Sequence, residues 1–148
     1  MRIGIDIDGV LTDIEQWQLD YGSKVIFEQY NKGIINSNGY DIKEIFDVER
    51  NLDDEFWRKY LYDYAIKEPA RKFSDEVTNK LREDGNEIYI ITARLNGIDD
   101  NIRNDMIKIV KQWLIKNKIV YDKLIFSKSE SENKLQEIID NEIDLMIE

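Results

Sequence analysis

Two residue types that carry much of enzyme chemistry are missing from this chain. Its 148 residues include no cysteine and no histidine. Without cysteine there is no disulfide, no thiolate nucleophile and no zinc–thiolate site. Without histidine there is no Ser–His–Asp triad, and no imidazole to serve as a general base or metal ligand. Any catalysis must therefore use carboxylates, hydroxyls, lysine, arginine or a hard metal ion held by oxygen atoms.

Long apolar runs and positive charge are also scarce. No apolar stretch reaches the roughly 20 residues that cross a bilayer, and the amino terminus lacks the apolar region of a signal peptide. We therefore expect a cytoplasmic protein with no membrane partner. The formal net charge is −10, which disfavours binding to DNA or RNA polymers, because these bind through basic surfaces. A small phosphorylated ligand stays compatible, since a metal ion reverses the local charge.

The apolar residues alternate between short runs and helical spacing. The 42% hydrophobic content is enough for a globular core. Short apolar strands that alternate with amphipathic helices predict an α/β fold with a parallel sheet and right-handed crossovers. The expected strands are residues 2–7, 87–94, 122–126 and 143–148. The expected helices begin near residues 14, 53, 74, 99 and 130, the last with a capping box at Ser129 and Glu132 and a core face of Leu135, Ile138 and Ile139.

The stretch between the first strand and Pro69 is too long for one crossover. We interpret it as a helical insertion, with an α/β core of residues 1–14 and 70–148 and a small helical cap of residues 15–69. Aromatic side chains concentrate in this cap. They are either a wall that stacks on a nucleobase or the core that a small helical unit needs. Trp17, which lies near Asp8 in the sequence, is the candidate for substrate contact.

Polar side chains follow three of the four expected strands. Asp6 and Asp8 end the first strand, Thr92 the second and Glu148 the fourth. Ligands of open parallel sheets bind outside the carboxyl ends of the strands. Two neighbouring carboxylates need a cation or a shared proton, and Mg²⁺ suits them. One carboxylate can then act as a nucleophile and the other as a general acid and base, while a hydroxyl and the ammonium of Lys134 hold phosphoryl oxygens.

Each of these residues also has a simpler interpretation. The two aspartates are also compatible with a strand that runs into an acidic, solvated turn. A calcium loop fits poorly, because Gly9 stands in the wrong place for one. Thr92 has the alternative of an ordinary threonine at a strand end. Arg94 is a candidate phosphate contact or an exposed salt-bridging residue, and Lys128 competes with Lys134.

The order of these motifs resembles the haloacid dehalogenase superfamily of phosphohydrolases. IGIDIDGVLTD (3–13) resembles its first motif, an apolar strand followed by Asp-x-Asp-Gly and a threonine. Those positions are Asp6, Asp8, Gly9 and Thr12. IITAR resembles the second motif with Thr92, Lys134 resembles the third, and IDLMIE (143–148) resembles the start of the fourth. The resemblance is closest to the bacterial 5'-nucleotidase and 5'(3')-deoxyribonucleotidase-like branch.

This resemblance implies a Rossmann-like sheet with strand order 3-2-1-4 and a role for each motif residue. Asp6 would be the nucleophile and a Mg²⁺ ligand. Asp8 would move protons and give its backbone carbonyl to the metal. Thr92 would bind phosphate, and Lys134 would shield negative charge. Glu148 would be the first acid of the fourth motif and a third metal residue.

One departure from the family pattern concerns the fourth motif. It usually has two adjacent acids, whereas this sequence stops after Glu148. We therefore expect a truncated gene product, whose metal affinity and activity depend on the missing acid. The predicted function is a Mg²⁺-dependent phosphomonoester hydrolase with an aspartyl-phosphate intermediate, acting on nucleoside or deoxynucleoside monophosphates. The alternatives are hydrolysis of a sugar phosphate or another small phosphate monoester, and a non-catalytic binding module.

Overall fold

A computed structural model describes residues 1–128 and 134–148 of the chain. The chain divides into two compact units, one formed by residues 1–12 and 69–148 and the other by residues 13–68. Among the described residues, none of the helices is long and apolar enough to cross a membrane.

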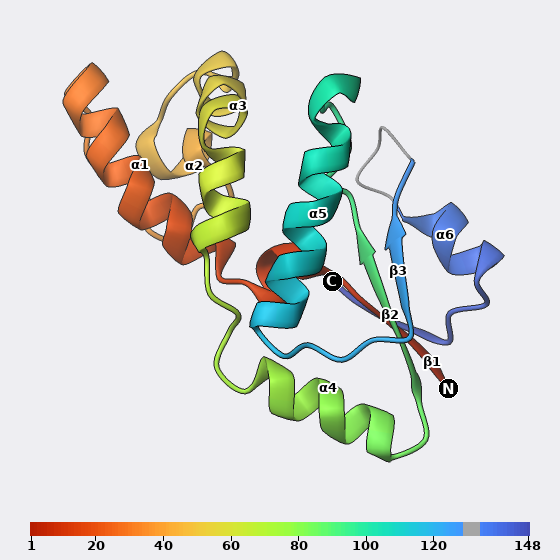
Figure 1. Cartoon of the computed structure of the whole chain (residues 1–148). Coiled ribbons are helices and arrows are strands. Elements are labelled where there is room, and N and C mark those ends of the chain that lie inside the picture. Colours follow the sequence, from red (N-terminus) through yellow and green to blue (C-terminus); the bar gives the residue numbers. More distant parts are fainter. Residues whose placement is uncertain (129–133) are drawn as a thin grey trace. The chain divides into compact units, whose positions relative to one another are not determined.

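The first unit is built on one parallel sheet of four strands (Figure 1). The strands are β1 (Arg2–Ile5), β2 (Glu87–Thr92), β3 (Lys123–Phe126) and β4 (Leu145–Ile147). Every neighbouring pair is parallel, and the order is β3-β2-β1-β4. The predicted α/β class and the strand order 3-2-1-4 are therefore confirmed.

The two central strands are buried, which explains their runs of isoleucine. A parallel strand covered on both faces is apolar throughout rather than alternating. The buried isoleucines are Ile3, Ile5, Ile88, Ile90 and Ile91, each at most 3% exposed. Gly4 lies between two of them, and a Cβ atom there would come 2.6 Å from the Met146 sulfur. The glycine thus permits the close approach of β1 and β4.

Three helices complete this unit: α4 (Ser74–Glu83), α5 (Asp100–Lys116) and α6 (Leu135–Asp140). Figure 1 shows α5 on one side of the strands and α6 on the other. Opposite sides are expected for right-handed crossovers, because the connection from β2 to β3 and the connection from β3 to β4 run across the sheet in opposite directions. The buried face of α5 consists of Met106, Val110, Trp113 and Leu114.

The predicted core face of the last helix is wrong at two positions. Leu135 is 53% exposed and Ile139 59% exposed, and α6 has no buried residue. The spacing correctly indicated one apolar side, but periodicity does not say what that side packs against. The capping box predicted at Ser129 and Glu132 lies outside the described residues.

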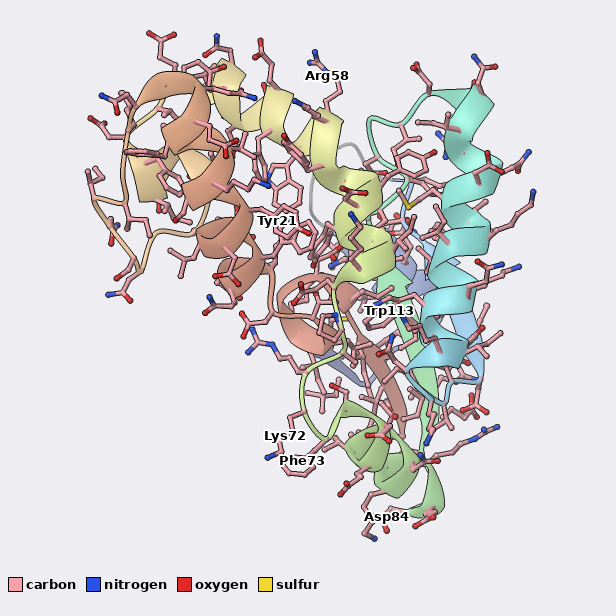
Figure 2. All side chains as sticks on the ribbon, turned by 60° about the vertical axis from the view of Figure 1, so that its left-hand side comes forward. Tyr21, Arg58, Lys72, Phe73, Asp84 and Trp113 are labelled. Atoms are coloured by element: carbon pink, nitrogen blue, oxygen red, sulfur yellow. The ribbon has the colours of Figure 1, made fainter. Side chains whose placement is uncertain are left out.

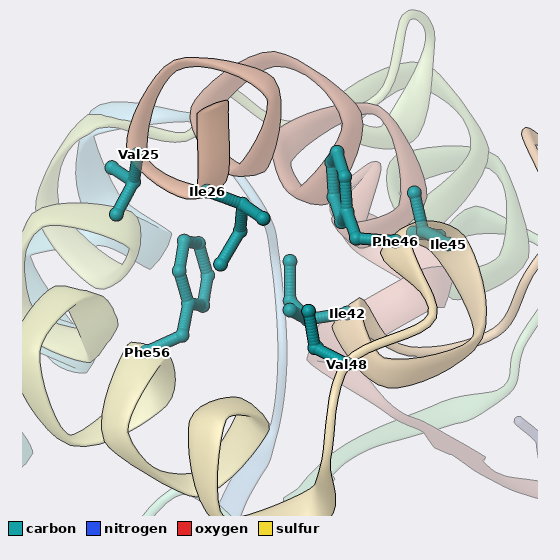
Figure 3. Packing of buried hydrophobic residues seen from close by; sticks show 7 residues of the cluster. All are labelled: Val25, Ile26, Ile42, Ile45, Phe46, Val48 and Phe56. Carbon is teal, nitrogen blue, oxygen red and sulfur yellow. The ribbon is translucent and has the colours of Figure 1, made fainter. Parts of the chain in front are cut away.

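The second unit contains α1 (Ile14–Tyr30), α2 (Ile42–Phe46) and α3 (Arg50–Lys67). The short helix α2 begins after Asp41, whose side chain accepts a hydrogen bond from the Glu44 amide at 2.8 Å. The three helices enclose one apolar cluster (Figure 3). Its members are Val25, Ile26, Ile42, Ile45, Phe46, Val48 and Phe56.

A glycine on α1 is required by this cluster, and its replacement should destabilise the protein. A Cβ atom at Gly22 would lie 2.5 Å from the Phe46 ring and 2.9 Å from Ile42, both buried. Overpacking costs about 1–3 kcal/mol, against a helix-propensity gain of about 1 kcal/mol for alanine. We expect Gly22→Ala to lower the free energy of unfolding by about 1 kcal/mol in urea titrations. Lys24→Ala, at an exposed position of α1, is the control, and a stabilised Gly22→Ala protein would contradict this account of the packing.

Candidate active site

The turn after β1 places two aspartates at the carboxyl edge of the sheet. Asp6 comes directly after the strand, and its amide donates to the Ile147 carbonyl at 3.0 Å. The predicted strand over residues 2–7 is thus shorter than expected, and Asp8 lies in a wide helical turn over Ile7–Leu11. Gly9 has φ 80° in this turn, a conformation that side chains disfavour.

The turn is closed by hydrogen bonds from a threonine and from a distant arginine. The amide and the hydroxyl of Thr12 both donate to the Ile7 carbonyl at 3.0 Å. Arg71 donates from Nε to the Thr12 carbonyl at 2.9 Å and from Nη2 to the Gly9 carbonyl at 3.2 Å. Arg71 could not be predicted from the sequence, because nothing local to it indicates contact with a turn about sixty residues away.

Asp6 and Glu148 meet at the ammonium group of Lys134. Lys134 Nζ donates to Asp6 Oδ2 at 2.5 Å and to Glu148 Oε1 at 3.0 Å. The other oxygen of Asp6 accepts from the Ile7 amide at 2.7 Å. The Lys134 side chain is 6% exposed and that of Asp6 15%, whereas Glu148 is half-exposed. Lys134 is therefore the lysine that reaches the first aspartate, and Lys128 is exposed.

Burial and charge act against each other on this pair. Burial raises the pKa of the Asp6 carboxyl, and the nearby charge of Asp8 adds to that effect, while Lys134 and the Ile7 amide oppose it; the net shift is upward. Burial alone would lower the pKa of Lys134, but the hydrogen bonds and charges of Asp6 and Glu148 outweigh it and raise that pKa. Lys134 consequently stays cationic beside Asp6 at neutral pH.

Asp8 is held by Arg94, whose side chain is only 1% exposed. Arg94 Nε lies 3.0 Å from each oxygen of Asp8, and Nη2 lies 2.6 Å from Oδ1. The guanidinium also lies over the Trp113 ring, 5.9 Å from its centroid. Arg94 is therefore not the exposed arginine that one sequence interpretation allowed, and the phosphate contact predicted for it stays a prediction.

Thr92 is the last residue of β2 and is fully buried. Its hydroxyl accepts a hydrogen bond from the Arg94 amide at 3.3 Å. The strand register pairs Ile5 with both Ile90 and Ile147. Asp6 and Glu148 directly follow these positions and Thr92 lies two residues after Ile90, so all three lie at one edge of the sheet. The sequence-predicted residues of the first unit are therefore brought to the same edge, and their chemical roles stay predictions.

Trp17 belongs to the second unit and is part of its interior. It is 4% exposed, stacks on Tyr21 with ring centroids 3.7 Å apart, and meets Tyr64 edge-on at 5.4 Å. Its indole nitrogen has no hydrogen-bond partner within the described part of the chain. These contacts are those of a core aromatic residue, and the substrate contact predicted for Trp17 stays untested.

The sheet edge carries oxygen donors of the kind that could hold a magnesium ion together with a ligand. Residues 1–128 and 134–148 contain no group of three acidic side chains arranged to hold a metal. Mg²⁺, however, is commonly held by one or two carboxylates, with waters and substrate phosphate oxygens as its other ligands. The Asp6 carboxylate and the Asp8 backbone carbonyl would supply two oxygen donors of the required kind. Glu148 and Asp6 both accept hydrogen bonds from Lys134, and the metal contact predicted for Glu148 stays a prediction.

The fold and the site together define an α/β protein with paired carboxylates at the carboxyl edge of a parallel sheet. No known family profile matches the chain. It is 31% identical over 127 residues to a curated Clostridium acetobutylicum protein named as a nucleotidase, an alignment that covers 84% of this chain and 58% of that relative. The chain thus spans less than two thirds of the relative's length.

A solved structure also resembles the chain. It is that of a Thermotoga maritima protein assigned as a beta-phosphoglucomutase, with a TM-score of 0.48 and 11% sequence identity. The superposition covers 89% of this chain and 63% of that protein.

Proposed function

We propose that this chain is a haloacid dehalogenase-type phosphatase, a Mg²⁺-dependent enzyme that hydrolyses phosphate monoesters through an aspartyl-phosphate on Asp6. The observation that carries the proposal is the buried contact of 2.5 Å between Asp6 and Lys134, directly after the central strand β1. A carboxylate held in this way has a fixed direction and a compensating positive charge. The similarity to a protein named as a nucleotidase supports the reaction class.

The proposed reaction has two steps. In the first, an Asp6 carboxylate oxygen attacks phosphorus, the bond from phosphorus to the ester oxygen breaks, and Asp8 gives its proton to the departing oxygen. In the second, water attacks the same phosphorus, Asp8 takes the proton from water, and the bond from Asp6 to phosphorus breaks. Lys134 and Thr92 would bind phosphoryl oxygens as negative charge develops on them. Bound Mg²⁺ would polarise the phosphoryl group and offset its charge.

The preferred substrates in this proposal are nucleoside or deoxynucleoside monophosphates. The name of the Clostridium acetobutylicum relative and the form of the first two motifs, DGVLTD and TAR, support that choice. Sugar phosphates and other small phosphate monoesters are the alternative substrates, because the described contacts involve groups that would recognise any phosphoryl group.

One observation favours a second candidate, a phosphate-binding module without turnover. Glu148, one of the three acids predicted to hold the metal, forms an ion pair with Lys134. A chain of this kind would bind inorganic phosphate without hydrolysing esters. Calorimetric titration with Mg²⁺ and with phosphate, next to the activity assay, separates the two candidates.

Release of inorganic phosphate tests the proposed function. The chain is incubated with a panel of ribonucleoside and deoxyribonucleoside monophosphates and sugar phosphates, with Mg²⁺ or with EDTA. We expect Mg²⁺-dependent release that is fastest with the nucleotides. The metal is required because the Asp6 carboxylate and the phosphate group are both negatively charged and repel each other without it. Release that is equally fast in EDTA would contradict the role of the metal. No release from any substrate, combined with phosphate binding, would favour the non-catalytic candidate.

A further inference from the structure

We propose that Arg94 is a positioning residue that fixes the Asp8 carboxylate for proton transfer, and that it does not bind the phosphoryl group itself. This inference rests on the proposed function, because it assigns the means by which the proton-transferring residue of that reaction is oriented. Asp8 follows β1 and Arg94 follows β2, so the contact joins the ends of two neighbouring strands.

The first support is the geometry of the contact. Arg94 Nε lies within hydrogen-bond distance of both Asp8 oxygens, and Nη2 makes a second and shorter contact to Oδ1. A guanidinium that engages a carboxylate through two nitrogens defines its plane as well as its distance. An aspartate in a turn with Gly9 at positive φ would otherwise have several staggered positions open to its side chain.

The second support is the way in which Arg94 itself is held. Its side chain is 1% exposed, it lies over the ring of Trp113 on α5 (labelled in Figure 2), and its amide donates to the Thr92 hydroxyl. A guanidinium that is buried and lies over an aromatic ring in this way has little room to follow a mobile ligand. Asp8 is the more accessible partner, with 26% of its side chain exposed. Arg94 is thus the fixed member of the pair, and Asp8 is the member that faces outward.

The third support is the separate pairing of the two aspartates. Lys134 contacts Asp6, and Arg94 contacts Asp8. Arg94 directs two of its three guanidinium nitrogens, Nε and Nη2, at Asp8. In this proposal the phosphoryl group is bound by Lys134 and by a metal ion, and Arg94 serves Asp8.

The dependence of the rate on the leaving group tests this role. A nucleoside monophosphate releases a basic alcohol that needs a proton in the first step, whereas p-nitrophenyl phosphate releases a weakly basic phenolate that does not. General acid catalysis contributes about 10²–10⁴-fold. We expect Arg94→Met to lower kcat/KM about 100-fold for the nucleotide, with a change of less than about threefold for p-nitrophenyl phosphate. Arg94→Lys, which keeps the charge but loses the fork, should lie between parent and Arg94→Met for the nucleotide.

Inhibition by inorganic phosphate distinguishes the positioning role from phosphate binding. Its inhibition constant should stay within about twofold of the parent in both variants if Arg94 does not touch the phosphoryl group. Arg103→Met is the matched control, because Arg103 forms an exposed pair with Asp100 on α5, and we expect parental rates with both substrates. An equal loss for both substrates in Arg94→Met and Arg94→Lys, or markedly weaker phosphate inhibition, would overturn the inference. A parent chain that hydrolyses neither substrate would instead refute the proposed function.

Discussion

Replacement of Asp6 by asparagine should abolish phosphate release while leaving the protein folded. Asparagine has nearly the same shape as aspartate but no charge, so it cannot form the bond to phosphorus. The loss of a covalent nucleophile usually costs many orders of magnitude, and we expect kcat to fall by a factor on the order of 10⁴ or more. Asp6 also lies in the buried contact with Lys134, so circular dichroism and urea unfolding must accompany the assay.

A matched acid outside the site gives the control for this variant. Asp100 is 95% exposed and pairs with Arg103 three residues further along α5. Asp100→Asn removes the same charge from the chain, and we expect it to keep the parental rate. Equal rates for the parent and Asp6→Asn would eliminate Asp6 as the nucleophile.

Replacement of Lys134 by methionine should have the next largest effect. Lys134 is the cation that contacts both Asp6 and Glu148, and methionine keeps its apolar stem without the charge. Removal of one donor to a developing negative charge costs about 10²–10³-fold in kcat, and we expect a fall of that size. The buried Asp6 carboxyl would also lose its main partner, which should lower the free energy of unfolding by about 1–3 kcal/mol.

Lys128 provides the comparison for this substitution. The sequence left Lys128 and Lys134 as competitors for one role, and the structure places Lys128 at an exposed position and Lys134 against Asp6. Lys128→Met should therefore leave both kcat and the urea midpoint unchanged within error. If Lys128→Met were the impaired variant and Lys134→Met the normal one, the assignment of the lysine would be wrong.

Much of the fold follows from the pattern of apolar residues. The isoleucine-rich runs of β1 and β2 have the length of buried strands, and the helical segments between them indicate a parallel sheet. The structure places both strands at the centre of that sheet. The order of the strands could be predicted only through the resemblance to known phosphohydrolases. What periodicity cannot supply is the environment of a helix, which is why Leu135 and Ile139 were expected in the core and are exposed.

Less of the candidate site than of the fold could be predicted from the sequence. Asp6 and Lys134 are 128 residues apart, and only the order of the motifs suggested that they meet. The sequence contains TAR after an apolar strand, but nothing in those letters says that Arg94 is buried over Trp113 or that it contacts Asp8. Such contacts depend on side-chain directions at the strand ends, and a charged residue there is usually assigned to solvent or ligand.

Trapping of the phosphorylated enzyme tests the central claim most directly. The chain is mixed with Mg²⁺ and substrate, quenched in acid within the first turnovers, digested and examined by mass spectrometry. We predict a phosphoryl group on the amino-terminal peptide, located at Asp6, that disappears after base treatment and is absent from Asp6→Asn. Phosphate release by a parent chain that carries no such group, or carries it on another residue, would contradict the claim.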